Sequence, residues 1–316
     1  MPPNPRFKAL PRVLSSAPLS RRPPPLLLGI GPTTTSRPCR LQLLSSPAAS
    51  NNIRTFSSSS KEKEEEEPLP LPPGRWYSDF QARLGKCILF GCSREQARRA
   101  AGVLRALATE WRALAAGAEG FLTGGRRGLE GQQVVWGEMD SFGHVNNANY
   151  IRYAESSRVN WILHFAGADP ANGARWRELM TPKGTGLIMK SITAEYKFPM
   201  TYPDTVSAYH KLRLEPAASD TSLALDCVVL SHRHRRVAAR TGEDVVVYDY
   251  AAARKAPLPP FALAALRDVW GRQRRESERA RARIREIAGL VRELERDTWD
   301  RSDAVEDLGA AGKGGK

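Results

Sequence analysis

The sequence predicts an α+β fold in which an antiparallel sheet wraps a long helix, with helical extensions on both sides. Three observations support this prediction. Apolar residues recur along one helical face after about Asn147, and four strand-like segments bounded by turn residues follow. Helical patterns also precede and follow this region. A helix that is apolar on one face and precedes antiparallel strands is expected to pack against the curved sheet that they form.

The positive charge of the chain is concentrated at its N-terminus. The first sixty residues hold seven Arg, one Lys and no acidic residue, which is +8 of the formal net charge of +14. The remaining residues therefore carry a net charge of only +6, which is +14 minus +8. Since the high positive charge of the chain was the main argument for nucleic-acid binding, its concentration at one end removes that argument. The composition of residues 1–56, rich in Arg, Ser, Pro and Leu, is typical of a mitochondrial transit peptide. We expect a matrix protein that starts near Ser57; the alternative is a basic tail that stays attached.

A linker and a helical extension are expected next. Residues 57–75 combine the acidic run Glu64–Glu67 with repeated proline and read as a disordered linker. In residues 76–121, Ser93 and Gln96 form a capping box, and apolar residues at three- and four-residue spacing follow it. They predict one amphipathic helix docked on the rest of the protein: Ala100, Val103, Leu104, Leu107, Trp111 and Leu114.

Two further features bound the class of protein. No apolar run approaches the length of a membrane span. Cys87, Cys92 and Cys227 remain outside the presumed presequence, an odd number without a CxxC motif, so buried free thiols are expected rather than zinc ligands or disulfides.

The predicted central domain occupies residues 130–260. A short apolar run, Val134–Trp136, precedes a helix whose apolar face is formed by Tyr150, Ile151, Ala154, Trp161, Ile162 and Phe165. A meander of four strands is expected to follow, at Leu187–Phe198, Thr205–Leu214, Ser222–Ser231 and Val237–Tyr250.

The C-terminal part is expected to be charged and helical. Residues 261–301 predict a solvated amphipathic helix with one narrow apolar seam of Ile284, Ile287, Val291 and Leu294. RNA binding by this helix is a minority alternative because its charges of both signs are interspersed. Residues 302–316 are expected to be a disordered tail.

The segment Trp136–Tyr150 contains the candidate catalytic residues. Asp140 follows a strand, a turn with Gly143 comes next, and the helix starts seven residues after Asp140. The turn can place the carboxylate beside the helix N-terminus, where unpaired N–H groups and the positive end of the dipole point outward. An acyl carbonyl oxygen bound to the amide of Asn147 would become electrophilic within reach of Asp140, or of a water that Asp140 holds.

This segment resembles the signature of hotdog-fold acyl-thioester hydrolases, in the 4-hydroxybenzoyl-CoA thioesterase-like branch. The resemblance covers about Gln132–Pro259, and Glu138 stands where many members have Asp. It implies a hotdog domain, a homodimer or homotetramer with active sites at subunit interfaces, and an acyl-CoA or acyl carrier protein substrate. We expect no cofactor, because a Gly-rich nucleotide loop and metal partners at suitable spacing are missing from the sequence.

The resemblance also assigns roles to residues. Asp140 would be the catalytic carboxylate, and the Asn147 N–H would polarise the thioester. His144 and Asn146 become candidates for orienting water. Some hotdog thioesterases draw their base from the helix, so Glu155 is the second carboxylate to test.

Each of these residues also has a structural alternative. Asp140 could cap the turn or the helix, and Asn146 or Asn147 could be the N-cap. His144 could be hydrogen-bonded within its turn. Glu155 could be an ion-paired helix residue, since Arg152 and Arg158 stand three positions before and after it.

Two other groups of basic residues receive weaker assignments. His210 shares a strand face with apolar residues and is interpreted as a core residue. His232–Arg236 is expected to be a solvated hairpin turn, although CoA phosphates could be bound there by charge-assisted hydrogen bonds.

Three functions are compared. The first is hydrolysis of an acyl-CoA thioester in the mitochondrial matrix. A hotdog dehydratase is disfavoured, because the Asn-Pro expected before the His is missing. The third is a non-catalytic hotdog scaffold that binds a matrix partner such as the mitochondrial ribosome. The fold alone does not choose among them.

Overall fold

The computed structural model describes residues 70–306. The predicted transit peptide at residues 1–56, most of the predicted linker at 57–75 and the end of the predicted tail lie outside the described residues. The described helices and strands are α1 (Trp76–Leu89), α2 (Arg94–Gly117), β1 (Gly128–Val134), α3 (Asn147–Ala168), α4 (Gly173–Glu178), β2 (Thr185–Tyr196), β3 (Asp204–Leu212), β4 (Ser222–Ser231), β5 (Arg236–Asp249), β6 (Arg254–Lys255) and α5 (Pro260–Thr298), with short 3-10 turns at Trp136–Glu138 and Pro170–Asn172.

The strands form one antiparallel sheet in the order β1-β3-β4-β5-β2, with β6 paired to β5. The predicted strand segments are confirmed to within a few residues, but the predicted four-strand meander is wrong. Only β3, β4 and β5 are consecutive neighbours, because β2 pairs with β5 at the far edge of the sheet. The alternation of apolar residues indicates which face of a strand is buried, and it carries no information about which strand lies beside it.

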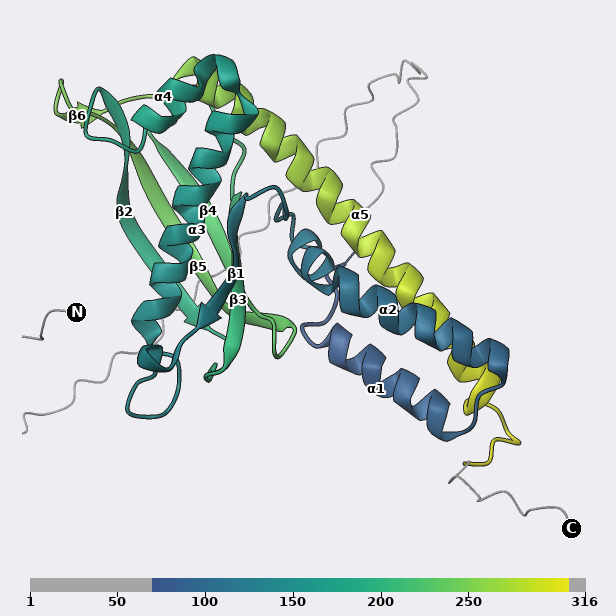
Figure 1. The fold of residues 1–316 in the computed structure, drawn as a ribbon. Helices are drawn as coiled ribbons and strands as arrows, with labels where there is room; N and C mark the ends of the chain where they lie inside the picture. Colours follow the sequence, from purple (N-terminus) through teal and green to yellow (C-terminus); the bar gives the residue numbers. More distant parts are fainter. Residues whose placement is uncertain (1–69, 307–316) are drawn as a thin grey trace, which may run out of the picture. The chain divides into compact units, whose positions relative to one another are not determined.

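The helix α3 lies across one face of this sheet, as the sequence predicted (Figure 1). Its first turns pack against the middle of the sheet in a buried cluster that includes Tyr150, Tyr153, Ala154, Val206, Ala208 and Val229. The prediction is wrong for one residue of the buried helix face: Ile151 is 36% exposed, and Tyr153 is buried instead. The polar Ser157 is also buried on this face, so the helix presents a mixed surface to the sheet.

Helices α1, α2 and α5 build a layer that reaches the opposite face of the sheet (Figure 1). Along β3, Ala208 belongs to the cluster under α3, whereas the next residue, Tyr209, belongs to the cluster of the helical layer. Since successive side chains of a strand point to opposite faces, the central strands are buried on both sides. The domain formed by α3 and the sheet is therefore packed against the helical extensions.

Two expectations about the extensions need correction. Residues 76–121 contain two helices rather than one, and the capping box begins the second: Ser93 Oγ accepts from Gln96 N, and Gln96 Oε1 accepts from Ser93 N. The C-terminal helix is not merely solvated. Its seam residues Ile284, Ile287, Val291 and Leu294 are buried against α1 and α2, because three amphipathic helices cover one another's apolar faces.

Two further predictions concern membranes and thiols. In the part of the chain that the structure describes, no helix is long and apolar enough to cross a bilayer. Cys87 and Cys227 are buried free thiols as predicted, whereas Cys92 is partly exposed.

Candidate active site

The loop between β1 and α3 is folded around the carboxylate of Asp140. Asp140 Oδ1 accepts hydrogen bonds from the backbone N of Phe142 at 2.8 Å and of His144 at 3.3 Å. The backbone of Asp140 also donates to the carbonyl of His144 and accepts from the N–H of Gly143, which adopts a left-handed φ of 74°. The second oxygen, Oδ2, accepts no hydrogen bond from the described residues. Asp140 thus closes its own turn with one oxygen, and its other oxygen has no hydrogen-bond partner among the described residues.

Glu138 ties the same loop to the helix. Its Oε2 accepts from Val135 N at 3.0 Å and from Tyr153 Oη at 2.8 Å. Its carbonyl accepts from the backbone of Asn146 and from the side chain of Asn149. Burial, reinforced by the bond to Glu138, raises the pKa of Tyr153 far above its ordinary value, so the phenol stays a hydrogen-bond donor. The Glu at this position therefore has a structural role.

Asn146 is the N-cap of α3, which decides between the two Asn residues that the sequence left open. Its Oδ1 accepts from Ala148 N at 2.9 Å. Asn147 is the first helical residue and is exposed, and an N–H at this position has no partner inside its helix. Tyr196 of β2 donates to the carbonyl of Asn147 at 3.3 Å. The cap leaves the Asn147 amide facing outward.

The structure brings four of the five predicted site residues together. Asp140, His144, Asn146 and Asn147 share one short loop and the helix start. The charge of Asp140 reaches Tyr150 in the first turn of α3, where it contributes to raising a pKa that burial raises most. The half-buried His144 ring makes no side-chain hydrogen bond to the described residues, so the loop uses only its backbone.

Glu155 lies apart from the other four residues. It is eight residues beyond Asn147, or about 12 Å along the helix axis, and its side chain is exposed. The ion pair expected with Arg158 is absent, since Arg158 Nη1 lies 2.8 Å from Glu243 Oε2 instead. Within the described residues, Glu155 forms no ion pair. The sheet supplies a buried acid that attracts Arg158 more strongly than an exposed helix neighbour does.

Exposed aromatic side chains surround the loop. Trp136 is 76% exposed and Phe142 is 83% exposed, and both flank Asp140 in sequence. Trp136 ends the apolar run that the sequence analysis took for a strand, but it lies in a 3-10 turn after β1.

Sequence reasoning missed a buried polar cluster between α3 and the sheet. His210 is buried as predicted, but Nδ1 lies 2.9 Å from Ser157 Oγ and Nε2 lies 3.2 Å from Glu243 Oε2. Thr241 and Arg158 also bind Glu243. The signal was available in the alternation of β5, where Glu243 occupies a position in register with buried apolar residues.

This cluster resembles a nucleophile, base and acid in series, but its geometry does not fit nucleophilic catalysis. Ser157 Oγ donates to the carbonyl of Ala208 at 2.8 Å, so its proton is directed away from His210. Ser157, His210 and Glu243 are each at most 1% exposed. We assign the cluster to packing between α3 and the sheet.

Known proteins share the part of the chain that carries this loop. Residues 134–266 match the family model described as the thioesterase-like superfamily. The chain is similar to a thioesterase of Thermus thermophilus complexed with coenzyme A and zinc, with 21% identity, 47% of this chain and 98% of that chain covered, and a TM-score of 0.37. It is also similar to the PA2801 protein of Pseudomonas aeruginosa, with 27% identity, coverage of 43% and 94%, and a TM-score of 0.34.

A further similar structure is a DHNA-CoA thioesterase of Staphylococcus aureus, with 13% identity, coverage of 50% and 89%, and a TM-score of 0.32. No curated protein matched the chain. The family match includes the loop of Asp140, the helix α3 and every strand of the sheet after β1. Residues 134–266 therefore form a hotdog-fold domain of the thioesterase-like superfamily, as the resemblance implied.

Proposed function

We propose that this domain hydrolyses acyl-CoA or acyl carrier protein thioesters, with Asp140 as the catalytic carboxylate. One observation carries the proposal: Asp140 is pinned by its Oδ1 to the loop that ends at the N-terminus of α3, while its Oδ2 accepts no hydrogen bond from the described residues. The family match to the thioesterase-like superfamily supports the reaction class.

The proposed chemistry uses the charges at the two ends of the loop. The thioester carbonyl oxygen accepts a hydrogen bond from Asn147 N–H at the positive end of the α3 dipole. In one route Asp140 removes a proton from water as the water adds to the carbonyl carbon; the carbon–sulfur bond then breaks, and the protonated Asp140 gives this proton to the leaving thiolate. In the other route Asp140 attacks the carbon itself, the carbon–sulfur bond breaks to leave an anhydride, and the thiolate takes a proton from solvent water; a second water then opens the anhydride and restores the Asp140 carboxylate. The products are a carboxylic acid and a thiol.

Asp140→Asn tests the proposal sharply. Asn keeps an acceptor oxygen for Phe142 and His144, so the loop is preserved while the negative charge is lost. We expect kcat on acyl-CoA to fall by about 100-fold or more. The full-length chain is assayed on panels of acyl-CoA and acyl carrier protein substrates of different acyl length.

The matched control is Asp220→Asn. Asp220 also accepts a backbone hydrogen bond in a turn, from Ala217 N at 2.8 Å, but it lies between β3 and β4. Glu155→Gln is assayed beside it. Full activity of Asp140→Asn would remove Asp140 from its role, and a selective loss in Glu155→Gln would move the base to the helix. If no substrate is hydrolysed, the non-catalytic scaffold takes precedence.

We also propose that the protein acts in the mitochondrial matrix. The support is the acid-free, Arg-rich composition of the first sixty residues. N-terminal sequencing of the protein from purified mitochondria is expected to find a start near Ser57. An intact Met1 would contradict import by cleavage.

A further inference from the structure

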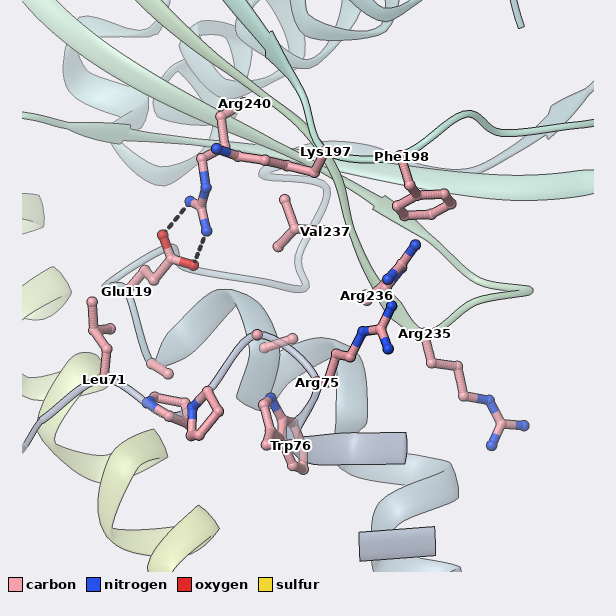
Figure 2. A pocket seen from close by; sticks show the side chains of 15 residues that line it. Leu71, Arg75, Trp76, Glu119, Lys197, Phe198, Arg235, Arg236, Val237 and Arg240 are labelled. Atoms are coloured by element: carbon pink, nitrogen blue, oxygen red, sulfur yellow. Dashed lines mark hydrogen bonds and ion pairs between the residues drawn. The ribbon is translucent and has the colours of Figure 1, made fainter. Parts of the chain in front are cut away.

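A cavity of about 510 Å³ lies where the helical extension meets the sheet (Figure 2), and no residue of the loop of Asp140 lines it. Its walls come from the segment before α1, the end of α2, and the neighbouring ends of β2 and β5. Small-molecule sites in proteins have volumes of about 300 to 1,000 Å³. Arg75, Trp76 and Glu119 on its walls precede residue 134, so the hotdog domain alone would not form it.

The walls carry an unbalanced positive charge. Five basic residues line the cavity together with one acid, Glu119: Arg75, Lys197, Arg235, Arg236 and Arg240. Glu119 is engaged by both terminal nitrogens of Arg240, and Lys197 pairs with Glu195. Arg75, Arg235 and Arg236 form no ion pair with any described residue. The Arg235 guanidinium lies over the Tyr77 ring, 5.1 Å from its centre, so Arg75 and Arg236 are the two guanidinium groups that share the cavity without a counter-ion from the described part of the chain.

Arg236 has an unsatisfied buried nitrogen and a lowered pKa in this cavity. Its Nε is buried and has no hydrogen-bond partner among the described residues. Burial, and then the positive charge of Arg75, lowers the pKa of Arg236 below its ordinary value. The guanidinium groups of Arg75 and Arg236 point toward each other in Figure 2. A phosphate group bound between them would accept hydrogen bonds from both and cancel their repulsion.

The remaining walls are aromatic and apolar. The Arg236 guanidinium carbon lies 3.9 Å from the centre of the Phe198 ring, and Trp76, Val237 and Leu71 are among the other lining residues. Arg235 has a left-handed φ of 50°, which is uncommon for a residue with a Cβ, at the hairpin turn that presents both arginines. The cavity therefore offers phosphate recognition beside a surface on which a planar group can stack.

We propose that this cavity is a binding site for a small phosphorylated ligand with an aromatic body, namely a nucleotide. The proposal does not rest on the proposed thioester hydrolysis. A nucleotide can reach the cavity as a free molecule or as the nucleotide part of coenzyme A, and the two sources share a phosphate group and a purine.

Calorimetric titration of the full-length chain with ADP, coenzyme A and inorganic pyrophosphate tests the proposal. We expect ADP to bind with one site per chain, and Arg75→Gln and Arg236→Gln each to weaken binding by at least about tenfold. Arg254→Gln removes an exposed arginine of β6 elsewhere on the domain and is the matched control, with affinity within about twofold of the wild type. Phe198→Leu should weaken ADP binding and spare pyrophosphate, because only ADP has a ring to stack. Asp140→Asn should bind ADP like the wild type, which separates this test from that of the hydrolase.

Coenzyme A distinguishes the two sources. If it displaces ADP and Arg75→Gln raises KM for acyl-CoA, the ligand is the nucleotide of the substrate; if it does not displace ADP, the ligand is a free nucleotide. The proposal is overturned if none of the three probes binds at millimolar concentration, or if Arg254→Gln weakens binding as much as Arg236→Gln.

Discussion

The two carboxylate oxygens of Asp140 differ in their hydrogen bonding. Oδ1 accepts from two loop N–H groups and thereby sets the path of the chain into α3. The structural alternative for Asp140, a turn cap, is therefore correct and does not exclude the catalytic role. Asn146 has a similar position, since its Oδ1 caps the helix and only its amide nitrogen is left for a ligand.

The cap can be tested at the level of one residue. Asn146→Ala is expected to lower the free energy of unfolding by about 1 kcal/mol, because Ala148 N loses its acceptor. If the Asn147 amide polarises the substrate, activity should fall as well, since the cap fixes the direction of that N–H. Asn146→Asp keeps an acceptor and should restore both properties. Urea unfolding and the thioesterase assay measure them, and activity that is unchanged in Asn146→Ala would argue against the amide.

An ion pair links the helix α3 to the strand β5, in addition to apolar packing. Burial by itself would raise the pKa of Glu243, but the neighbouring His210 ring and the charge of Arg158 outweigh it, so the pKa lies below its usual range. Glu243 is thus an ionised acid inside the core, and its partners come from α3 and β3. Such a network is costly to break from one side.

Arg158→Leu tests this network. The change leaves Glu243 buried without its strongest permanent cation, so we expect a loss of about 3 kcal/mol in the free energy of unfolding. Arg152→Leu, six residues earlier on the exposed side of α3, should change stability by less than about 0.5 kcal/mol. Denaturant midpoints of the two variants measure the difference. Equal midpoints would show that the ion pair is dispensable.

The turn between β4 and β5 is only partly solvated, which corrects the sequence prediction. The His232 ring packs on Trp111 of α2 at 5.4 Å between ring centres, and Nε2 lies 2.9 Å from Ser207 Oγ. Burial, and then the charge of Arg112, lowers the pKa of His232. The folded state therefore binds a proton less readily than the unfolded chain does.

This lowered pKa predicts the direction of a pH effect. Between the lower folded pKa and the ordinary value near 6.5, the unfolded chain binds more protons, so stability falls as the pH drops through this range. His232→Gln has no proton to bind there. The loss of thermal stability between neutral pH and about pH 5.5 should be smaller in His232→Gln than in the wild type. A larger loss in the variant would contradict the assigned direction.

At the scale of the whole molecule, the family domain is only one part of the folded chain. Its sheet is covered by α3 on one face, and the helical layer packs against Tyr209, Val228 and Leu230 on the other. Among the described residues, open regions include the outer edges of β1 and β2, which each pair with one strand, and the exposed aromatics of the site loop. An unpaired edge and exposed aromatics are both features through which a second copy can bind.

We therefore predict a homo-oligomer that covers the loop of Asp140. Light scattering after size exclusion should give a multiple of the 34.9 kDa chain mass, and Phe142→Asp, at an 83% exposed position, should shift the protein toward the monomer with a loss of activity. Leu214→Asp, at a 66% exposed position after β3, is the control and should leave the mass unchanged. A fully active wild-type monomer would contradict the prediction.

The sequence by itself determined the helix that starts at Asn147, the strand segments, the capping box at Ser93 and the grouping of Asp140, His144, Asn146 and Asn147. All of these depend on residues close together in the chain, where periodicity and capping act. Only the tertiary structure decided that β2 pairs with β5, that Arg158 binds Glu243, and that Arg75 and Arg236 line the same cavity. These contacts join residues far apart in the sequence, and their partners are chosen by burial and charge in the folded chain, which no local pattern records.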